Sequence, residues 1–185
     1  MNKTKKIVIT GMMAAVVSVL SVLQIPTPTG VPITLQTFTM ALAGYSLGAA
    51  LGAASTAIYV LLGLIGIPVF AGFVSGPGVL FGPTGGFIFG FIILAAVSGL
   101  SIRYSGGKKG FVISIIAGIL GLTAVYILGA LQYAILANIS FLKSFSLVAL
   151  PFAVKDILSV IAADLAGSAL RTVLSRANLM EYKKA

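Results

Sequence analysis

Residues 66–91 read GIPVFAGFVSGPGVLFGPTGGFIFGF, a segment rich in glycine and proline without a single charged side chain. It holds eight of the 22 glycines and three of the seven prolines of the chain. Ordinary loops are polar, because their unpaired backbone groups need water. A loop as apolar as this one must bury its backbone in protein or line a cavity, since lipid offers no hydrogen bonds. Glycine also lets a backbone approach a ligand closely. We therefore expect this segment to form part of a binding site in a membrane protein.

The composition of the whole chain indicates a membrane protein. Of its 185 residues, 59% are hydrophobic and 8% are charged, and the mean hydropathy is +1.16. A soluble domain of this size could not bury so much apolar surface in one core. The chain contains no cysteine and no histidine, so it lacks thiolate chemistry and the usual ligands of zinc. We expect one all-α membrane domain over residues 1–185, with the lipid bilayer as a partner and no cofactor.

The basic residues fall into three clusters that predict the membrane topology. Cytoplasmic segments of membrane proteins are enriched in lysine and arginine, so the net charge of +9 indicates orientation in a membrane rather than a nucleic-acid partner. If all three clusters are cytoplasmic, both termini are cytoplasmic as well. The clusters are Lys3, Lys5 and Lys6; Arg103, Lys108 and Lys109; and Arg171, Arg176, Lys183 and Lys184.

The apolar runs can be counted as five or six membrane spans. The run 35–65 is long enough for one tilted helix or for two short ones. The three basic clusters lie on the same side of the membrane only if the run 35–65 forms two helices, so we predict a six-helix bundle. We also expect the Gly/Pro-rich loop between the third and fourth helices to be buried at the outer side. The predicted helices are 7–25, 35–47, 50–65, 84–103, 110–137 and 148–172.

Small residues recur at a four-residue spacing that predicts helix-packing seams, because they let two backbones come close in a bilayer. One internal seam is Gly44, Gly48 and Gly52, and another is Gly78, Gly82, Gly86 and Gly90. The first predicted helix carries the pairs Gly11/Ala15 and Ala14/Ser18. These pairs could dock a partner protein or a neighbouring helix of the same bundle.

Charged residues within the predicted spans are candidate ligand-binding groups. Asp164 lies well inside the last predicted helix, where a carboxylate is expensive and indicates function; the alternative is a structural bond to Ser168 or to another helix. Asp156 lies about 80° around and roughly 12 Å along the same helix, so the two carboxylates could span a small molecule. Lys155 is adjacent to Asp156, and adjacent residues do not share a helical face. Its alternative role is to extend towards the lipid headgroups.

An enzyme is not expected. The chain has no Gly-x-x-x-x-Gly-Lys-Ser/Thr loop for ATP and no histidine to act as a general base. Its three acidic residues provide few groups that could act as general acids or bases.

Three blocks of the sequence resemble one family of membrane proteins. They are PITLQTF (32–38), GIPVFAG (66–72) and GPTGGFIFGF (82–91). In this order and spacing they are similar to the BioY family, the biotin-specific substrate-binding subunits (S components) of energy-coupling factor (ECF) transporters. A fourth block, PFAVKDILS (151–159), departs from the family pattern. Asp156 is in place, but Lys155 stands where glycine is usual and Ser159 where lysine is usual, so the partner of the ligand carboxylate stays open.

The resemblance implies a six-helix S component that captures biotin from outside the prokaryotic cytoplasmic membrane. It also implies a transmembrane coupling subunit and two ATP-binding subunits as partners. A small face on the first helix would contact the coupling subunit, with Ala14/Ser18 as the matching pair and Gly11/Ala15 as an adjacent option. The expected ligand-binding residues are Thr34, Gln36, Phe70, Ala71, Gly72, Tyr126, Lys155, Asp156 and Asp164.

Other functions remain as alternatives. One is a stand-alone small-molecule transporter, which should show two related halves or a continuous polar path. Another is an S component for a different vitamin. A structural or assembly protein is the third, although it would need neither an apolar Gly/Pro loop nor buried aspartates.

Overall fold

The computed structural model describes residues 2–104 and 107–182, so Lys183 and Lys184 of the predicted third basic cluster lie outside the described residues. The described part of the chain is mostly helical. Its elements are α1 (Lys3–Ser21), β1 (Gln24–Ile25), β2 (Ile33–Thr34), α2 (Gln36–Leu47), α3 (Ala49–Leu64), α4 (Pro77–Leu80), α5 (Gly85–Leu100), η1 (Ser101–Tyr104), α6 (Gly107–Ala137), α7 (Phe141–Val148), η2 (Leu150–Phe152) and α8 (Ala153–Arg176).

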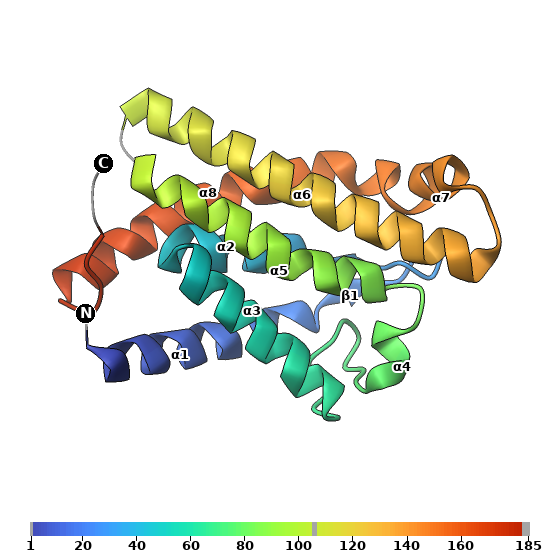
Figure 1. Cartoon of the computed structure of the whole chain (residues 1–185), viewed down its shortest axis with the longest axis horizontal. Coiled ribbons are helices and arrows are strands. Elements are labelled where there is room, and N and C mark those ends of the chain that lie inside the picture. Colours follow the sequence, from blue (N-terminus) through green and yellow to red (C-terminus); the bar gives the residue numbers. More distant parts are fainter. Residues whose placement is uncertain (1, 105–106, 183–185) are drawn as a thin grey trace.

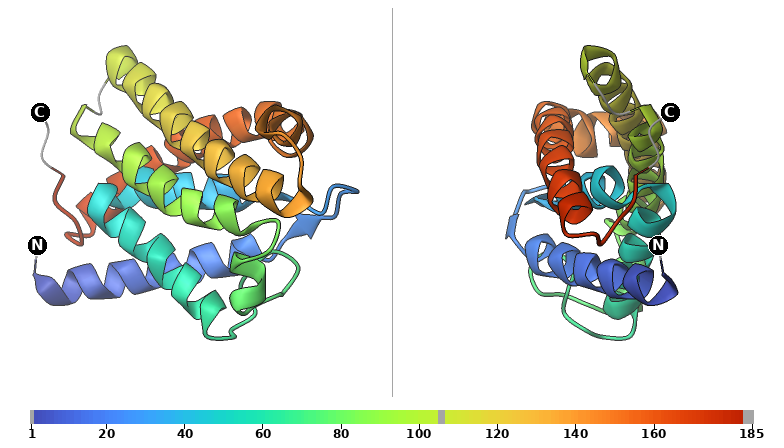
Figure 2. Two further views of the ribbon diagram at one scale, coloured as in Figure 1. Left: turned by 45° about the vertical axis from the view of Figure 1, so that its right-hand side comes forward. Right: turned by 90° about the vertical axis from the view of Figure 1, so that its left-hand side faces the viewer.

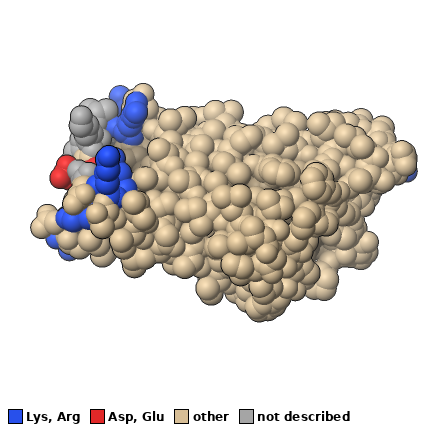
Figure 3. Space-filling model, turned by 60° about the horizontal axis from the view of Figure 1, so that its bottom comes forward, with Lys and Arg blue, Asp and Glu red and all other residues tan. Residues whose placement is uncertain are grey.

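The helices connect two chemically different ends of the molecule (Figures 1 and 2). The start of α1, the 3-10 helix η1, the start of α6 and the end of α8 lie at one end, which we call the basic end. Lysine and arginine side chains gather there, while the rest of the visible face is free of them except at the far tip (Figure 3). The opposite end, which we call the loop end, contains the two-stranded β1–β2 ribbon, α4 and α7.

Helix α2 forms the centre of the bundle. All of its residues except Phe38 are buried, and it packs against α1, α3, α5 and α8. Since α2 is buried around nearly its whole circumference, other helices enclose it. The short α2 therefore meets other helices rather than lipid along most of its surface.

Glycines let the helices approach closely, most clearly between α5 and α6. A Cβ atom built on Gly90 would lie 2.6 Å from the Cα atom of Val125, which is closer than a real side chain allows. Gly52 of α3 meets Gly44 of α2 in the same way, with 2.7 Å between the built Cβ and the Gly44 Cα atom. These contacts confirm close helix packing at Gly44, Gly52 and Gly90, because small residues permit backbone contact. Gly48 instead links α2 to α3, and the built Cβ of Gly82 meets only its own loop. Gly78 lies outside the seam, with no described atom within 4 Å of its built Cβ.

Two helices differ in position from the sequence prediction. Helix α1 begins at Lys3 because the Asn2 side chain caps it, and it ends before Gln24 because that residue pairs with β2. Helix α8 begins after Pro151, which lies in η2, since proline disrupts a helix interior. The short helix α7 was not predicted.

Within the described residues, four segments are long and apolar enough to cross a membrane: Lys3–Ser21, Gly85–Tyr104, Gly107–Ala137 and Phe141–Arg176. Helix α3 is apolar but has only 16 residues, and α2 has 12. The described part of the chain is thus mostly helical, with apolar helices of membrane length and two shorter helices at the place where the sequence was ambiguous.

The Gly/Pro-rich loop is less buried than expected. Between α3 and α5 only Val69, Phe70 and Leu80 are buried, and Phe73 is 68% exposed. The loop backbone forms hydrogen bonds at its own turns and with helix ends; for example, the Gly76 amide donates to the Gly63 carbonyl over 2.7 Å. The expectation of a buried loop was therefore wrong for most of its length, because local bonds satisfy the backbone that burial was expected to protect.

Candidate functional site

A cavity of about 370 Å³ lies at the loop end of the bundle. Segments far apart in the sequence form its wall: the β1–β2 ribbon, the start of α2, the Gly/Pro-rich loop, α5, α6 and the start of α8. Its volume falls within the range of roughly 300–1,000 Å³ typical of small-molecule sites. The lining residues are Gln24, Gly30, Val31, Pro32, Thr34, Gln36, Thr37, Phe70, Ala71, Val74, Gly78, Val79, Gly82, Pro83, Thr84, Phe87, Ile88, Phe91, Val125, Tyr126, Phe152, Lys155 and Asp156.

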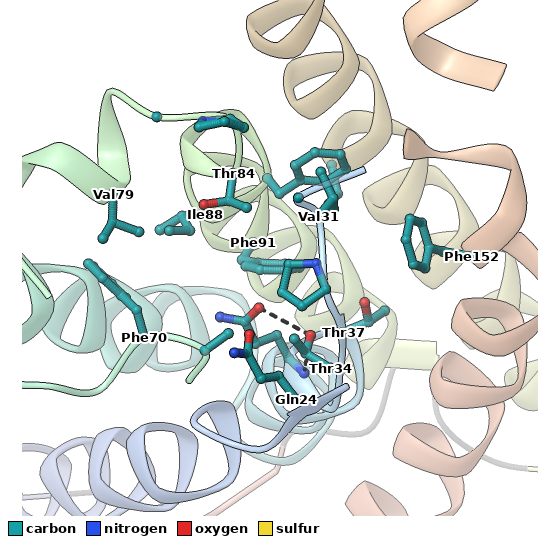
Figure 4. Close-up of a pocket in the computed structure, with 18 of the residues that line it drawn as sticks. Gln24, Val31, Thr34, Thr37, Phe70, Val79, Thr84, Ile88, Phe91 and Phe152 are labelled. Carbon is teal, nitrogen blue, oxygen red and sulfur yellow. Dashed lines mark hydrogen bonds between the residues drawn. The ribbon is translucent and has the colours of Figure 1, made fainter. Parts of the chain in front are cut away.

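Most of the cavity wall is apolar. Phe70 from the loop and Phe152 from η2 flank it on opposite sides in the view of Figure 4, and Phe91 of α5 lies between them. The Phe70 ring packs edge-on against Tyr59, with 5.5 Å between ring centroids. Gly63 makes room for the Phe70 ring, because a Cβ atom there would collide with it. The aromatic wall is thus held from behind by helix α3.

A chain of hydrogen bonds fixes the polar groups at the start of α2. The Thr34 hydroxyl donates to Gln36 Oε1 over 3.1 Å, and Gln36 Nε2 donates to the Tyr59 hydroxyl over 2.7 Å. All three residues are buried. Since both ends of the Gln36 amide have partners, its orientation is defined, and it presents a fixed polar edge to the cavity.

The charged groups of the cavity come from the first turns of α8. The Tyr126 hydroxyl donates to Asp156 Oδ2 over 2.7 Å, and Asp156 Oδ1 forms an ion pair with Lys155. Oδ1 accepts no hydrogen bond from the described residues. Lys155 Nζ also donates to the Thr34 carbonyl over 2.9 Å, so it ties α8 to β2. The expectation that Lys155 and Asp156 face different ways was wrong, because the long lysine side chain folds back at the start of the helix.

The cavity gathers most of the predicted ligand-binding residues. Thr34, Gln36, Phe70, Ala71, Tyr126, Lys155 and Asp156 line it. Gly72 does not: its amide donates to the Val22 carbonyl over 2.9 Å, and its φ of +76° is one that side-chain-bearing residues rarely adopt. Gly72 therefore shapes the turn that carries Phe70 and Ala71.

The prediction that Asp164 lies at the ligand-binding site differs from the structure. Asp164 is buried but does not line the cavity; its side chain interacts with Ser114 of α6 and lies within electrostatic reach of Arg171. The Arg171 guanidinium donates to the Tyr45 carbonyl near the end of α2. This arrangement fits the alternative of a structural bond to another helix. The two aspartates share α8 and both meet α6, but at different levels: Asp156 at Tyr126 and Asp164 at Ser114.

The chain beyond α8 returns to the same region. The Tyr182 hydroxyl donates to the Ser46 carbonyl over 2.9 Å. Burial raises the pKa of Tyr182 to about 12, so this donor keeps its proton at neutral pH. The end of α2 is therefore capped by groups from the C-terminal part of the chain.

The four predicted docking residues on α1 point in two directions. Ala14 is 2% exposed and Ser18 is 7% exposed, and the Ser18 hydroxyl bonds the Ala14 carbonyl. Gly11 and Ala15 are exposed. Ala14 and Ser18 are thus unavailable for docking, because they face the bundle, and the accessible small pair is Gly11/Ala15.

Sequence reasoning missed several lining residues that a helical pattern could have found. Thr84, Phe87, Ile88 and Phe91 all line the cavity, and their spacing of i, i+3, i+4 and i+7 marks one face of a helix. Gln24 carries no comparable signal, because it reaches the cavity only through the pairing of β1 with β2.

An apolar cavity with a few convergent polar groups, held in a bundle of membrane-length helices, defines a membrane-embedded small-molecule-binding protein. The sequence profile of the BioY family matches residues 1–176. The chain belongs to the BioY family, as its sequence blocks indicated.

Individual relatives agree with this assignment. The biotin transporter BioY of Thermotoga maritima is 40% identical over 135 residues, which cover 73% of this chain and 78% of the relative. The biotin transporter BioY2 of Lactococcus lactis subsp. cremoris is 35% identical over 167 residues, 89% of each chain. The fold is similar to the crystal structure of the S-component for biotin from an ECF-type ABC transporter, with a TM-score of 0.76, 28% identity, and coverage of 94% of this chain and 92% of that one.

Proposed function

We propose that this chain binds biotin and serves as the substrate-capture subunit for biotin uptake through an ECF-type ABC transporter. The observation that carries the proposal is the cavity, whose mostly apolar wall contains one acidic and one basic side chain, Asp156 and Lys155, and a few neutral polar groups. The names of the BioY relatives and of the similar crystal structure support biotin as the ligand.

The chemistry of biotin fits the distribution of groups in the cavity. Its ureido ring offers two N–H donors, and Asp156 Oδ1 is a carboxylate oxygen whose one contact among the described polar groups is the Lys155 ion pair. Its sulfur-containing ring and aliphatic chain suit the wall formed by Phe70, Phe91 and Phe152. Its carboxylate suits Lys155, the one cationic side chain among the described residues that line the cavity. Lys155 would then exchange part of its pairing with Asp156 for the ligand carboxylate.

The membrane topology we propose has six spans: α1, α2, α3, α5, α6 and α8. The positive-inside rule places the basic end in the cytoplasm and the cavity at the outer surface. Helix α2 would be about 18 Å long at 1.5 Å per residue, which is short for a hydrocarbon core of about 30 Å. Its enclosure by other helices removes the need to match the lipid thickness.

Transport requires partners that supply energy. We propose a transmembrane coupling subunit and two ATP-binding subunits, since the chain carries no P-loop sequence of its own. The exposed pair Gly11/Ala15 is the docking face that the structure leaves available for close helix contact. This chain would then capture the ligand without acting as an enzyme.

The test is binding of radiolabelled biotin to the purified full chain in lipid nanodiscs. We expect saturable binding that unlabelled biotin abolishes and that thiamine or riboflavin does not. Competition by another vitamin instead of biotin would show an S component with a different ligand. Uptake by proteoliposomes that contain only this chain would indicate the stand-alone transporter.

A further inference from the structure

Two adjacent residues of α6 hold two different loops at the loop end. Gln132 Nε2 donates to the Leu80 carbonyl over 2.9 Å and to the Gly82 carbonyl over 2.6 Å. The Tyr133 hydroxyl donates to the Thr29 carbonyl over 3.1 Å. Both side chains are half-buried, and neither lines the cavity. One turn of α6 is therefore hydrogen-bonded to two separate segments, one at Thr29 and one at Leu80 and Gly82.

The bonded carbonyls belong to the loops that form the cavity wall. Thr29 directly precedes Gly30, Val31 and Pro32, and all three of these residues line the cavity. Leu80 lies between two residues that line the cavity, Val79 and Gly82. A displacement of either loop from α6 would thus move the wall that the ligand meets.

The other hydrogen bonds of the two loops are local. In the segment 26–32, the Thr27 hydroxyl bonds the Val31 carbonyl over 2.7 Å, and the Gly30 amide bonds the Thr27 carbonyl over 3.1 Å. In the segment 77–84, backbone amides bond carbonyls three or four residues earlier, as Phe81 does with Pro77. Such bonds keep the shape of a loop but do not fix its position. Among the described residues, the side-chain hydrogen bonds that join these segments to another helix come from α6, while Val31 and Leu80 of the two segments also pack in the hydrophobic core.

Close packing fixes the Gln132 amide in this position. A Cβ atom built on Gly85 would lie 2.6 Å from Gln132 Nε2. The glycine at the start of α5 therefore gives the amide access to the two carbonyls. Tyr126 lies on the same helix two turns before Tyr133, rotated by only about 20°, and bonds Asp156. The same face of α6 thus contacts Asp156 in the cavity and the segment 26–32.

We propose that Gln132 and Tyr133 are positioning residues that pin the 77–84 loop and the 26–32 loop, respectively, to α6, and thereby set how fast the ligand enters and leaves the cavity. The proposal rests on the proposed function for the identity of the ligand, biotin. The pinning of the loops themselves is independent of that identity.

The kinetic test uses near-isosteric variants that lack the donor. Gln132→Met and Tyr133→Phe should each increase the dissociation rate of radiolabelled biotin about three- to tenfold, the effect of losing a typical hydrogen bond. Thr123→Val is the matched control, because the Thr123 hydroxyl bonds only Ile119 in the same helix, and its dissociation rate should equal that of the parent. Parental dissociation rates in both variants would overturn the proposal.

The second test needs no ligand, so it separates this proposal from the proposed function. The chain contains no cysteine, and a spin label can be attached through Phe81→Cys on one loop or Pro28→Cys on the other. Both positions are exposed and neither lines the cavity. Gln132→Met should increase the mobility of the label at position 81 only, and Tyr133→Phe that of the label at position 28 only.

The pattern of label mobility decides between pinning and a general structural role. Equal mobilisation of both labels by either variant, together with a lower melting temperature, would show that the two residues only stabilise the bundle and would overturn the proposal. Unchanged mobility at both positions would overturn it as well. Failure of the parent chain to bind biotin would refute the proposed function but leave the spin-label result valid.

Discussion

Asp156 and Asp164 form a natural pair for testing the site, because both are buried carboxylates on α8 and only Asp156 lines the cavity. Asp156 is 4% exposed and accepts a 2.7 Å hydrogen bond from Tyr126. If its carboxylate also accepts a ureido N–H of biotin, Asp156→Asn removes a hydrogen bond to a charged group. Such a bond contributes about 1.5–3 kcal/mol, which corresponds to a rise in Kd of roughly 12- to 140-fold. Asp164→Asn should change the Kd by less than about threefold, since distant sites without shared partners act independently.

The assay is equilibrium binding of radiolabelled biotin to both variants in nanodiscs. Gel filtration and thermal unfolding show whether each variant is folded. Asp164→Asn should lower the melting temperature, because the Asp164 side chain interacts with Ser114 of another helix. Equal losses of affinity in two folded variants, or parental affinity in Asp156→Asn, would refute the placement of the site.

Two further predictions concern docking and topology. Gly11→Leu should preserve biotin affinity, because a Cβ atom built on Gly11 meets no described atom within 4 Å. It should lower co-purification with the coupling subunits at least about tenfold, since close helix contacts depend on small residues. Ala14→Leu should instead destabilise the chain by about 1–3 kcal/mol through overpacking, and the reverse pattern would exclude the exposed face as the docking surface. In intact cells, an impermeant thiol reagent should label Lys143→Cys at the loop end and spare Lys108→Cys at the basic end, and labelling at position 108 would contradict six spans with cytoplasmic termini.

The parts of the site that could be predicted depend on local sequence. Thr34, Gln36, Phe70 and Ala71 lie in blocks whose order and spacing resemble the BioY family, and all four line the cavity. Asp164 was assigned to the same site because a carboxylate inside a membrane span indicates function and because it shares a helix with Asp156. The position of a residue in a helix gives the direction of its side chain relative to the other residues of that helix, but not which neighbouring helix it faces. The neighbour of Asp164 is Ser114 of α6.

The sequence by itself determined the membrane class, the helical composition and the family. Hydropathy, glycine spacing and the three blocks that resemble the BioY family are properties of neighbouring residues, so they can be read without knowing which helices touch. Only the tertiary structure decided which polar groups share the cavity. Lys155 meets the carbonyl of Thr34, 121 residues away, and Gln132 meets Leu80, 52 residues away. These contacts depend on the rotation and depth of each helix in the bundle, which arise from the packing of all the helices together.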